Sequence, residues 1–387
     1  MKTVRDSECD EAGETLLRHS ALSPYEMRDR VVLFLGAGAS APLSIPTSKE
    51  FIPRFLEASP QFSNMWLGIE SRLSKSGYSQ PIDLEAAMTV LDALSSVDPI
   101  AYLEDAAGAA PFFFFQSDFA SSIEKISLDY GQQSNKMAEA LRLFVRQKCE
   151  RPDFSKIRIY DSLMSAIGEG PWNIPDRGNY SFTMRGTPRF NIPDFYCFTT
   201  NYDLAFERYC RRELKIQVKT GFRDEQGEVT LSRHDLLNHD VPFGVLHLHG
   251  SVEMLRVSDG NIIPTPTYPK GMTITSRGEE VEGEAMIYPV LEKQLSRFPF
   301  PEVFSAMYEQ LRESPLAVFV GFSFRDLPIV RLLQDASHRD QKIVIVSNTA
   351  REIANTLRPK LRGQVIAAPG RIGQPNLKEI IAGVRNE

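Results

Sequence analysis

Cysteine is scarce in this sequence and is never closely spaced. The four cysteines among 387 residues form no C-x-x-C pair; they are Cys9, Cys149, Cys197 and Cys210. This spacing argues against a disulfide-rich scaffold and against a cysteine zinc site. We therefore expect reduced thiols and no bound metal.

Long apolar runs are also missing. Residues 1–8 carry no apolar signal region, and the apolar stretch at residues 31–46 is interrupted by glycine, serine and proline. No membrane segment is expected, and the sequence favours a cytoplasmic protein.

The sequence has no excess of positive charge. The net charge is -6 and the sequence pI is about 5.7, so direct nucleic-acid binding over a broad surface is not expected. Apolar residues make up 42% of the chain, which is enough for an ordinary globular core. The length allows roughly two to three domains.

The stretch that organises the chain is residues 31–41, with the sequence VVLFLGAGASA. Five apolar residues bounded by glycine predict a buried parallel strand. The pattern Gly36-x-Gly38-x-x-Ala41 fits a dinucleotide fingerprint, and Ser40 stands where a helix could begin. A strand-turn-helix unit that uses small residues only for packing would look the same.

Similar units of strand, polar loop and helix recur along the chain. The expected strands are residues 195–198, 245–249, 317–320, 342–346 and 364–367. This recurrence predicts an α/β fold with a doubly wound, Rossmann-like parallel sheet.

Three other regions flank this pattern. Residues 1–30 are expected to form a polar arm, and residues 218–289 a strand- and turn-rich segment. Helical spacing at residues 83–94, 137–145 and 159–167 predicts a large helical insertion at about 52–190. Within it, the phenylalanine run 112–115 is typical of a core or a subunit interface.

Polar or glycine residues follow several of the expected strands. They are residues 36–40, 199–203, 249–250, 321–323 and 347–348. In a doubly wound sheet these strand ends converge on one crevice, where ligands bind.

In this order the motifs resemble the sirtuin family, and more narrowly its divergent bacterial branch found in anti-phage defence proteins. They are Gly36-Ala37-Gly38-Ala39-Ser40, Thr200-Asn201-Tyr202-Asp203, His249-Gly250-Ser251, Gly321-Phe322-Ser323 and Asn348. The resemblance implies a sirtuin-type NAD-binding domain over residues 31–387, with NAD+ as the substrate.

The resemblance also implies a role for each motif. The catalytic pair is Asn201 and His249, with His249 as the base. Residues expected to contact NAD+ are Gly36, Ala37, Gly38 and Ser40 at the phosphates, Asp203 at the nicotinamide ribose, Gly321, Ser323 and Asn348 toward the adenosine, and Thr47 in a covering loop.

Two departures from the family separate this chain from sirtuin deacylases. It lacks a four-cysteine zinc module, and the family's second motif is reduced to Ile45-Pro46-Thr47. The defence branch shares both departures, and its members resemble NAD glycohydrolases. The leading hypothesis is therefore an NAD+ glycohydrolase that acts in abortive infection. Alternatives are a regulatory subunit that binds NAD or ADP-ribose, and an NAD-dependent protein deacylase.

The side chains suit this hydrolysis. Nicotinamide already carries a positive charge in NAD+ and leaves without a general acid, while positive charge develops on the ribose. Asn201 can hold a water or a ribose hydroxyl, and His249 can take the proton from that nucleophile.

Several residues keep a second interpretation. His249 could be a hydrogen-bonded core histidine, and Asn201 could cap a turn. His247 is expected on the same strand face as His249 and in a structural role; no third ligand accompanies this pair. The basic residues between Arg351 and Arg362 predict a solvated helix face, with a nucleic-acid or partner surface as the alternative.

A toxic NAD hydrolase must be restrained, and the sequence carries no recognisable sensor domain. We therefore expect a homo-oligomer, with subunit contacts through the helical insertion, and a separate trigger protein. By family resemblance the trigger would be a HerA-type hexameric ATPase or a short Argonaute.

Overall fold

The computed structural model describes most of the chain. The described residues are 31–75, 82–96, 117–168, 181–182, 190–191, 194–225, 228–237, 243–258, 260–264, 278, 280–286 and 298–374. The predicted arm at 1–30, the phenylalanine run at 112–115 and a helix expected near the C-terminus at 377–384 lie outside them.

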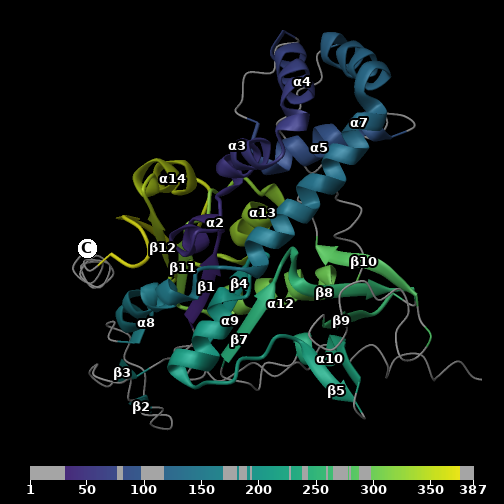
Figure 1. Ribbon diagram of the computed structural model, residues 1–387. Helices are drawn as coiled ribbons and strands as arrows, with labels where there is room; N and C mark the ends of the chain where they lie inside the picture. The colour runs from purple at the N-terminus through teal and green to yellow at the C-terminus, as the bar shows by residue number, and fades with distance from the viewer. Residues whose placement is uncertain are drawn as a thin grey trace, which may run out of the picture.

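A six-stranded parallel sheet forms the centre of the molecule (Figure 1). Its strands stand in the order β13-β12-β11-β1-β4-β7. Their bounds are β1 Val31–Leu35, β4 Phe195–Thr199, β7 Phe243–His247, β11 Leu316–Val320, β12 Lys342–Ser347 and β13 Gln364–Pro369. Short apolar runs such as VVLFL and LAVFV suit strands that are buried on both faces. The prediction of a doubly wound parallel sheet is confirmed.

The chain reverses its direction of travel across the sheet at β1. It passes from β1 to β4 and β7 on one side, then returns to β11, β12 and β13 on the other. Such a switch point opens a crevice at the carboxyl ends of the adjacent strands, here β1 and β11. The loops after these two strands are the predicted glycine motifs.

Helices cover both faces of this sheet. Alternate strand residues such as Leu33 and Cys197 pack with α8 (Tyr160–Gly168) and α9 (Ala205–Tyr209), which continues as a π-helix at Cys210–Leu214. The other face, including Phe34 and Phe319, packs with three helices. These are α12 (Phe300–Glu313), α13 (Leu327–Ala336) and α14 (Ala350–Leu357).

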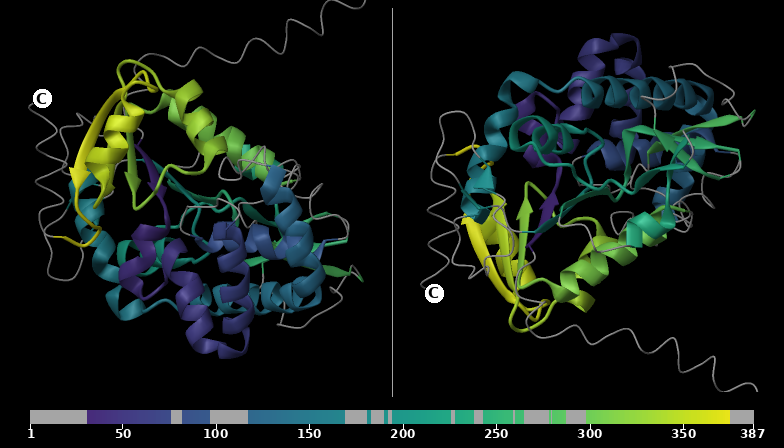
Figure 2. Two further views of the ribbon diagram at one scale, coloured as in Figure 1. Left: turned by 90° about the horizontal axis from the view of Figure 1, so that it is seen from above. Right: turned by 90° about the horizontal axis from the view of Figure 1, so that it is seen from below.

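Four helices form a separate body, here called the helical subdomain. They are α3 (Ser48–Ala58), α4 (Ser63–Lys75), α5 (Leu84–Ser95) and α7 (Ser117–Glu150), and they share a hydrophobic core of their own. Figures 1 and 2 show α4 and the start of α7 projecting from the sheet body. Asp83 caps α5 by accepting a hydrogen bond from Ala86 N at 3.1 Å. Because α8 belongs to the sheet's core instead, this subdomain ends at α7.

The region at 218–289 is rich in strands. It contains β5 (Phe222–Glu225), β6 (Glu228–Leu231), α10 (Arg233–Leu237) and β7, followed by a second sheet of β8 (Gly250–Val257), β9 (Ile262–Pro264) and β10 (Val281–Met286). The remaining short elements are α2 (Ala37–Ser40), the 3-10 turns Ala41–Leu43, Pro60–Phe62 and Phe154–Ile159, and the pair β2 (Ser181–Phe182) and β3 (Phe190–Asn191).

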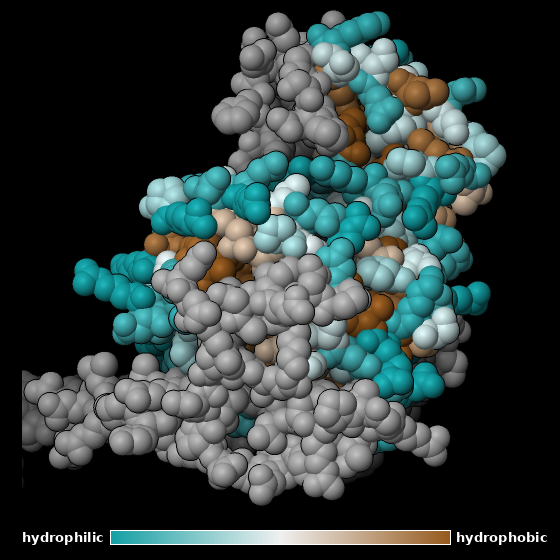
Figure 3. Space-filling model, turned by 90° about the vertical axis from the view of Figure 1, so that its left-hand side faces the viewer, coloured by the Kyte–Doolittle hydropathy of each residue, from teal (hydrophilic) through white to brown (hydrophobic). Residues whose placement is uncertain are grey.

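The surface view shows no sign of one dominant apolar area among its coloured residues. In Figure 3 brown residues stand in separate small groups between hydrophilic ones. No helix in the described part of the chain is both long enough and apolar enough to cross a membrane.

Candidate functional site

Two glycine loops pack directly on each other at the switch point. A Cβ atom on Gly36 would come within 2.7 Å of Gly321 O, and one on Gly38 within 2.8 Å of Gly321 Cα. Gly321 itself has a φ of +63°, a conformation that favours glycine. The predicted glycines therefore let the β1–α2 and β11–α13 loops meet at van der Waals distance.

The backbone donors of these glycines are already used. Gly36 N donates to Val320 O at 2.9 Å, Gly38 N to Gly321 O at 3.0 Å, and Gly321 N to Val346 O at 2.9 Å. Because these N–H groups already have backbone partners, they are not free to bind a phosphate, and the contact of this loop with the NAD+ phosphates stays a prediction. Their observed role is to join three strand ends into one rigid edge.

Ser40 ends the short helix α2 and holds the N-cap position of the 3-10 turn Ala41–Leu43, but its hydroxyl does not cap that turn. Gly36 holds the cap position, and no side chain caps α2. The Ser40 hydroxyl is buried and accepts a hydrogen bond from Asn201 Nδ2 at 2.9 Å. Ser40 thus connects the loop after β1 to the loop after β4.

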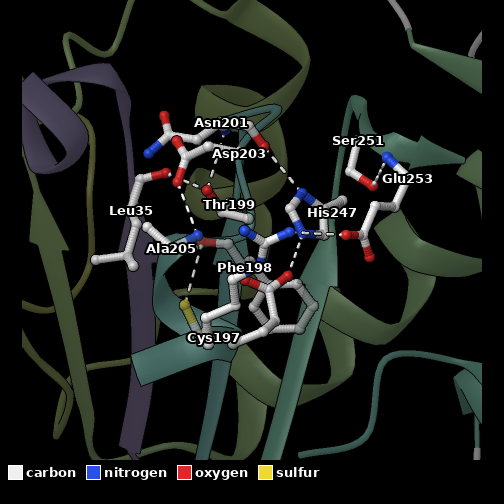
Figure 4. A network of polar contacts seen from close by, with 12 residues as sticks. Leu35, Cys197, Phe198, Thr199, Asn201, Asp203, Ala205, His247, Ser251 and Glu253 are labelled. Carbon is white, nitrogen blue, oxygen red and sulfur yellow. Dashed lines mark hydrogen bonds and ion pairs between the residues drawn. The ribbon is translucent and has the colours of Figure 1, made fainter. Parts of the chain in front are cut away.

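Among the described residues, every polar atom of Asn201 except Oδ1 has a hydrogen-bond partner, and Figure 4 shows the bonds of its backbone N–H and carbonyl. Its Nδ2 also donates to Gly36 O at 3.1 Å, and its backbone N–H donates to Thr199 Oγ1 at 3.0 Å. Since Gly36 O is a carbonyl, the side-chain atom facing it must be the amide nitrogen. The Oδ1 atom remains as an acceptor for a ligand.

Asp203 lies next to Asn201 and is buried. Its carboxylate accepts a hydrogen bond from Ala205 N at 3.0 Å. Burial raises the pKa of Asp203, while hydrogen bonds from Ala205 and Ser40 oppose the rise.

The two histidines face different partners, so the expectation of one shared strand face was wrong. His247 ends β7, but His249 lies in the turn before β8. His247 Nδ1 donates to Asn201 O at 2.8 Å, and its Nε2 contacts the Glu207 carboxylate. Burial alone would lower the pKa of His247, but the Glu207 carboxylate and these hydrogen bonds raise it.

His249 pairs with Asp326 instead. Its Nε2 lies 3.0 Å from Asp326 Oδ2, and its side chain is 5% exposed. The other oxygen of Asp326 caps α13 by accepting from Ile329 N at 3.2 Å. Because a helix N-terminus stabilises a carboxylate, Asp326 is a fixed anionic partner for His249.

A pocket joins the sheet body to the helical subdomain. It encloses about 530 Å³ between its atoms, part of it open to solvent. One wall, here called the sheet wall, is formed by Ala37, Ser40, Thr200, Asn201, Tyr202, Asp203 and His249. The other, here called the helical wall, is formed by Ile45, Pro46, Ser48, Phe51, Leu84, Glu85 and Cys149.

Glu85 is the ionisable group of the helical wall that sequence reasoning missed. Burial, then the carboxylates of Asp83 and Asp326, raise the pKa of Glu85 to about 8, while Arg325 opposes them. Arg325 Nη1 in turn pairs with Asp83 Oδ2 at 3.1 Å and ties α5 to the loop after β11. Cys149 is buried, which raises its thiol pKa and argues against a reactive thiolate.

Three predicted contact residues lie outside the pocket lining. Thr47 caps α3, and its hydroxyl and N–H both bond Glu50 Oε2, at 2.9 and 2.8 Å. Ser323 and Asn348 are exposed, on the loops after β11 and β12. All three stay predictions as NAD contacts. Among the described residues no group of three or more metal-ligating side chains comes together.

Comparison with protein-family models gives one match. Residues 196–362 match the model of the SIR2-like domain. This part of the chain is similar to the SIR2-like domain. The match begins in β4 and ends before β13, so it includes Asn201, His249 and Asp326. A SIR2-like domain suggests NAD binding or NAD-dependent activity at a general level.

Three solved structures similar to this chain share little sequence identity with it. One is a Sir2 homologue mutant in complex with 2′-O-acetyl ADP ribose, at 14% identity, covering 94% of this chain and 97% of that one, with a TM-score of 0.37. Another is a Sir2 homolog–NAD complex, at 14% identity, covering 95% of both chains, with a TM-score of 0.39. A third, from work on the mechanism and regulation of Sir2 enzymes, has 16% identity, covers 93% of this chain and 95% of that one, and has a TM-score of 0.36. No curated protein sequence matches the chain.

Proposed function

We propose that this sirtuin-like chain hydrolyses NAD+ to nicotinamide and ADP-ribose. The observation that carries the proposal is the pairing of His249 with Asp326 beside Asn201 in one pocket. A histidine oriented by a fixed carboxylate is a recurring general base. The SIR2-like domain supports NAD as the substrate class.

The hydrogen bonds assign the working atoms. A carboxylate only accepts hydrogen bonds, so His249 Nε2 carries the hydrogen of its bond to Asp326. In the neutral ring the other nitrogen, Nδ1, is then unprotonated and can act as the base. Asn201 Oδ1 accepts from a ribose hydroxyl or from water. The C1′–N bond breaks with its electrons moving to nicotinamide, water adds to C1′, and His249 takes the water proton.

The test measures nicotinamide release from NAD+ by chromatography. Asn201→Ala and His249→Ala are each expected to lower the rate by on the order of a hundredfold or more. His234→Ala, on an exposed residue of α10, serves as the matched control. If wild-type protein, alone and with genome-neighbour proteins, never consumes NAD+, the proposal fails.

Two alternatives give different results in the same assay. A sensor of NAD or ADP-ribose would bind its ligand without turnover, and binding would survive His249→Ala. A protein deacylase would release acetyl groups from a lysine peptide. The absence of C-x-x-C pairs in the sequence, and hence of a sirtuin-type zinc module, argues against that activity.

We further propose that the activity serves anti-phage defence by NAD depletion, in a homo-oligomer controlled by a trigger such as a HerA-type ATPase or a short Argonaute. The defence-branch resemblance supports the role. Exposed leucines on the helical subdomain support subunit contacts there: Leu67 is 60% exposed, Leu128 87% and Leu143 55%. Light scattering that gives a monomer at micromolar concentration would argue against self-assembly.

A further inference from the structure

Glu85 is a pocket carboxyl that the proposed mechanism does not use. It stands on the first turn of α5 and lines the same pocket as Asn201 and His249. Among the described residues, no hydrogen bond or ion pair engages its side-chain oxygens. A carboxyl that faces a pocket without a protein partner can pair with a ligand.

The surroundings of Glu85 carry more negative than positive charge. Asp83 and Asp326 flank it, and the one cation that acts on it among the described residues, Arg325, is paired with Asp83. The other titratable groups of the pocket are His249, Asp203, Tyr202 and Cys149. Burial and these carboxylates keep Glu85 neutral near pH 7 in the free protein, and an entering cation would reverse that balance.

We propose that Glu85 recognises the charge of the substrate: in the pocket that it shares with Asn201 and His249, its carboxylate pairs with the positively charged nicotinamide ring of NAD+. Because the pKa of Glu85 is raised, the carboxyl gives up its proton when the ring binds. This inference rests on the proposed function. The proton that Glu85 releases goes to solvent. At neutral pH the cationic nicotinamide ring therefore takes the place of a proton on Glu85. After the glycosidic bond breaks, nicotinamide is neutral, Glu85 takes a proton back, and the charge pair that held the substrate is lost.

The charge pair with Glu85 would act on substrate binding and not on the chemical step. The pair stabilises the charged ring in the ground state, whereas the transition state moves that charge to the ribose. Glu85→Gln keeps the size and the hydrogen-bonding capacity of the side chain but cannot ionise. We expect it to raise KM for NAD+ roughly tenfold and to leave kcat unchanged or slightly higher.

The experiment measures binding by calorimetry with two ligands. Carba-NAD+ keeps the cationic ring but is not hydrolysed, and NADH carries a neutral ring. Measuring each at about pH 7 in two buffers of different ionisation enthalpy counts the protons released. Wild-type protein is expected to release nearly one proton with carba-NAD+ and none with NADH. At about pH 10, where Glu85 is already ionised, the release disappears.

Glu85→Gln is expected to abolish this release and to remove the preference for carba-NAD+ over NADH. The matched control is Glu57→Gln, the same change on an exposed residue of α3 in the same subdomain. Cooperative melting of both variants at temperatures no lower than that of the wild type excludes misfolding. Tight binding of carba-NAD+ with no proton release, or with release that persists in Glu85→Gln, would overturn the inference and leave the proposed function standing. No binding and no turnover of NAD+ by the wild type would overturn both.

Discussion

The two walls of the pocket are built in different ways. On the sheet wall, Asn201 and His249 are fixed by hydrogen bonds to other loops of the sheet. On the helical wall, apolar side chains such as Phe51 and Leu84 line the pocket together with the half-buried Glu85, whose oxygens have no partner among the described residues. Rigid hydrogen bonding suits chemistry, because it holds reacting groups in place. A carboxyl on the helical subdomain that has no protein partner suits selection of the ligand, because it can pair with a charge on the ligand.

The first prediction concerns what holds the sheet wall in place. His247 lies between the Asn201 carbonyl and the buried Glu207 carboxylate. Replacing His247 with Gln leaves Glu207 buried without its partner, and we expect a loss of about 3 kcal/mol or more in the free energy of unfolding. Urea denaturation at neutral pH measures this. His234→Gln, on an exposed histidine, should cost almost nothing.

The loss of unfolding free energy in His247→Gln should decrease as the pH rises. The folded pKa of His247 is raised above its usual value near 6.5, so its contribution is complete below that pH and is lost as the pH rises through the folded value. The stability difference between wild type and His247→Gln should therefore shrink at alkaline pH. A difference that grows with pH would contradict the charged His247–Glu207 pair.

The second prediction tests the orientation of His249. Asp326→Asn keeps an oxygen to cap α13 but removes the carboxylate that faces Nε2. We expect kcat for NAD+ hydrolysis to fall by roughly 10- to 100-fold with little change in KM. Asp335→Asn, on an exposed position of the same helix, is the control. An unchanged kcat would show that His249 needs no carboxylate.

The sheet was predictable because its signal is local. Runs of about five apolar residues followed by polar loops gave all six strands, and parallel strands bring their ends to one edge. Asn201 and His249 could be found because they stand at those ends. The close packing of Gly36 and Gly38 against Gly321 could not be predicted, because it joins loops far apart in the sequence; their contact with phosphate stays a prediction.

The helical wall was not predictable from local pattern. Glu85 occupies the first turn of an amphipathic helix, where an acid already has an ordinary explanation in the helix dipole. What places it in the pocket is the packing of α5 across the sheet edge. The Asp83–Arg325 contact that joins them links residues 242 positions apart. No periodic pattern in the sequence predicts such a contact.

The third prediction measures the cost of the unpartnered carboxyl. The folded pKa of Glu85 is about 8, above its usual 4.5, so the wild type loses stability as the pH rises between those values. Glu85→Gln removes this loss. We expect the variant to melt a few degrees higher than the wild type near pH 9 and to match it near pH 4.5. Equal melting temperatures at both pH values would mean that Glu85 is hydrated in the free protein.

The smallest effect is expected where the two walls meet. Arg325 pairs with Asp83, but its side chain is 35% exposed, so the pair adds at most about 1 kcal/mol. Arg325→Gln also removes the cation that lowers the pKa of Glu85. We expect KM for NAD+ to rise two- to threefold, roughly, at neutral pH, because ionising Glu85 then costs more. The pH at which proton release on binding disappears should move upward.

The exposed Arg331→Gln on α13 controls for loss of charge alone. If the pH dependence of proton release stays the same in Arg325→Gln, the walls act independently, and the ion pair only docks α5 on the sheet.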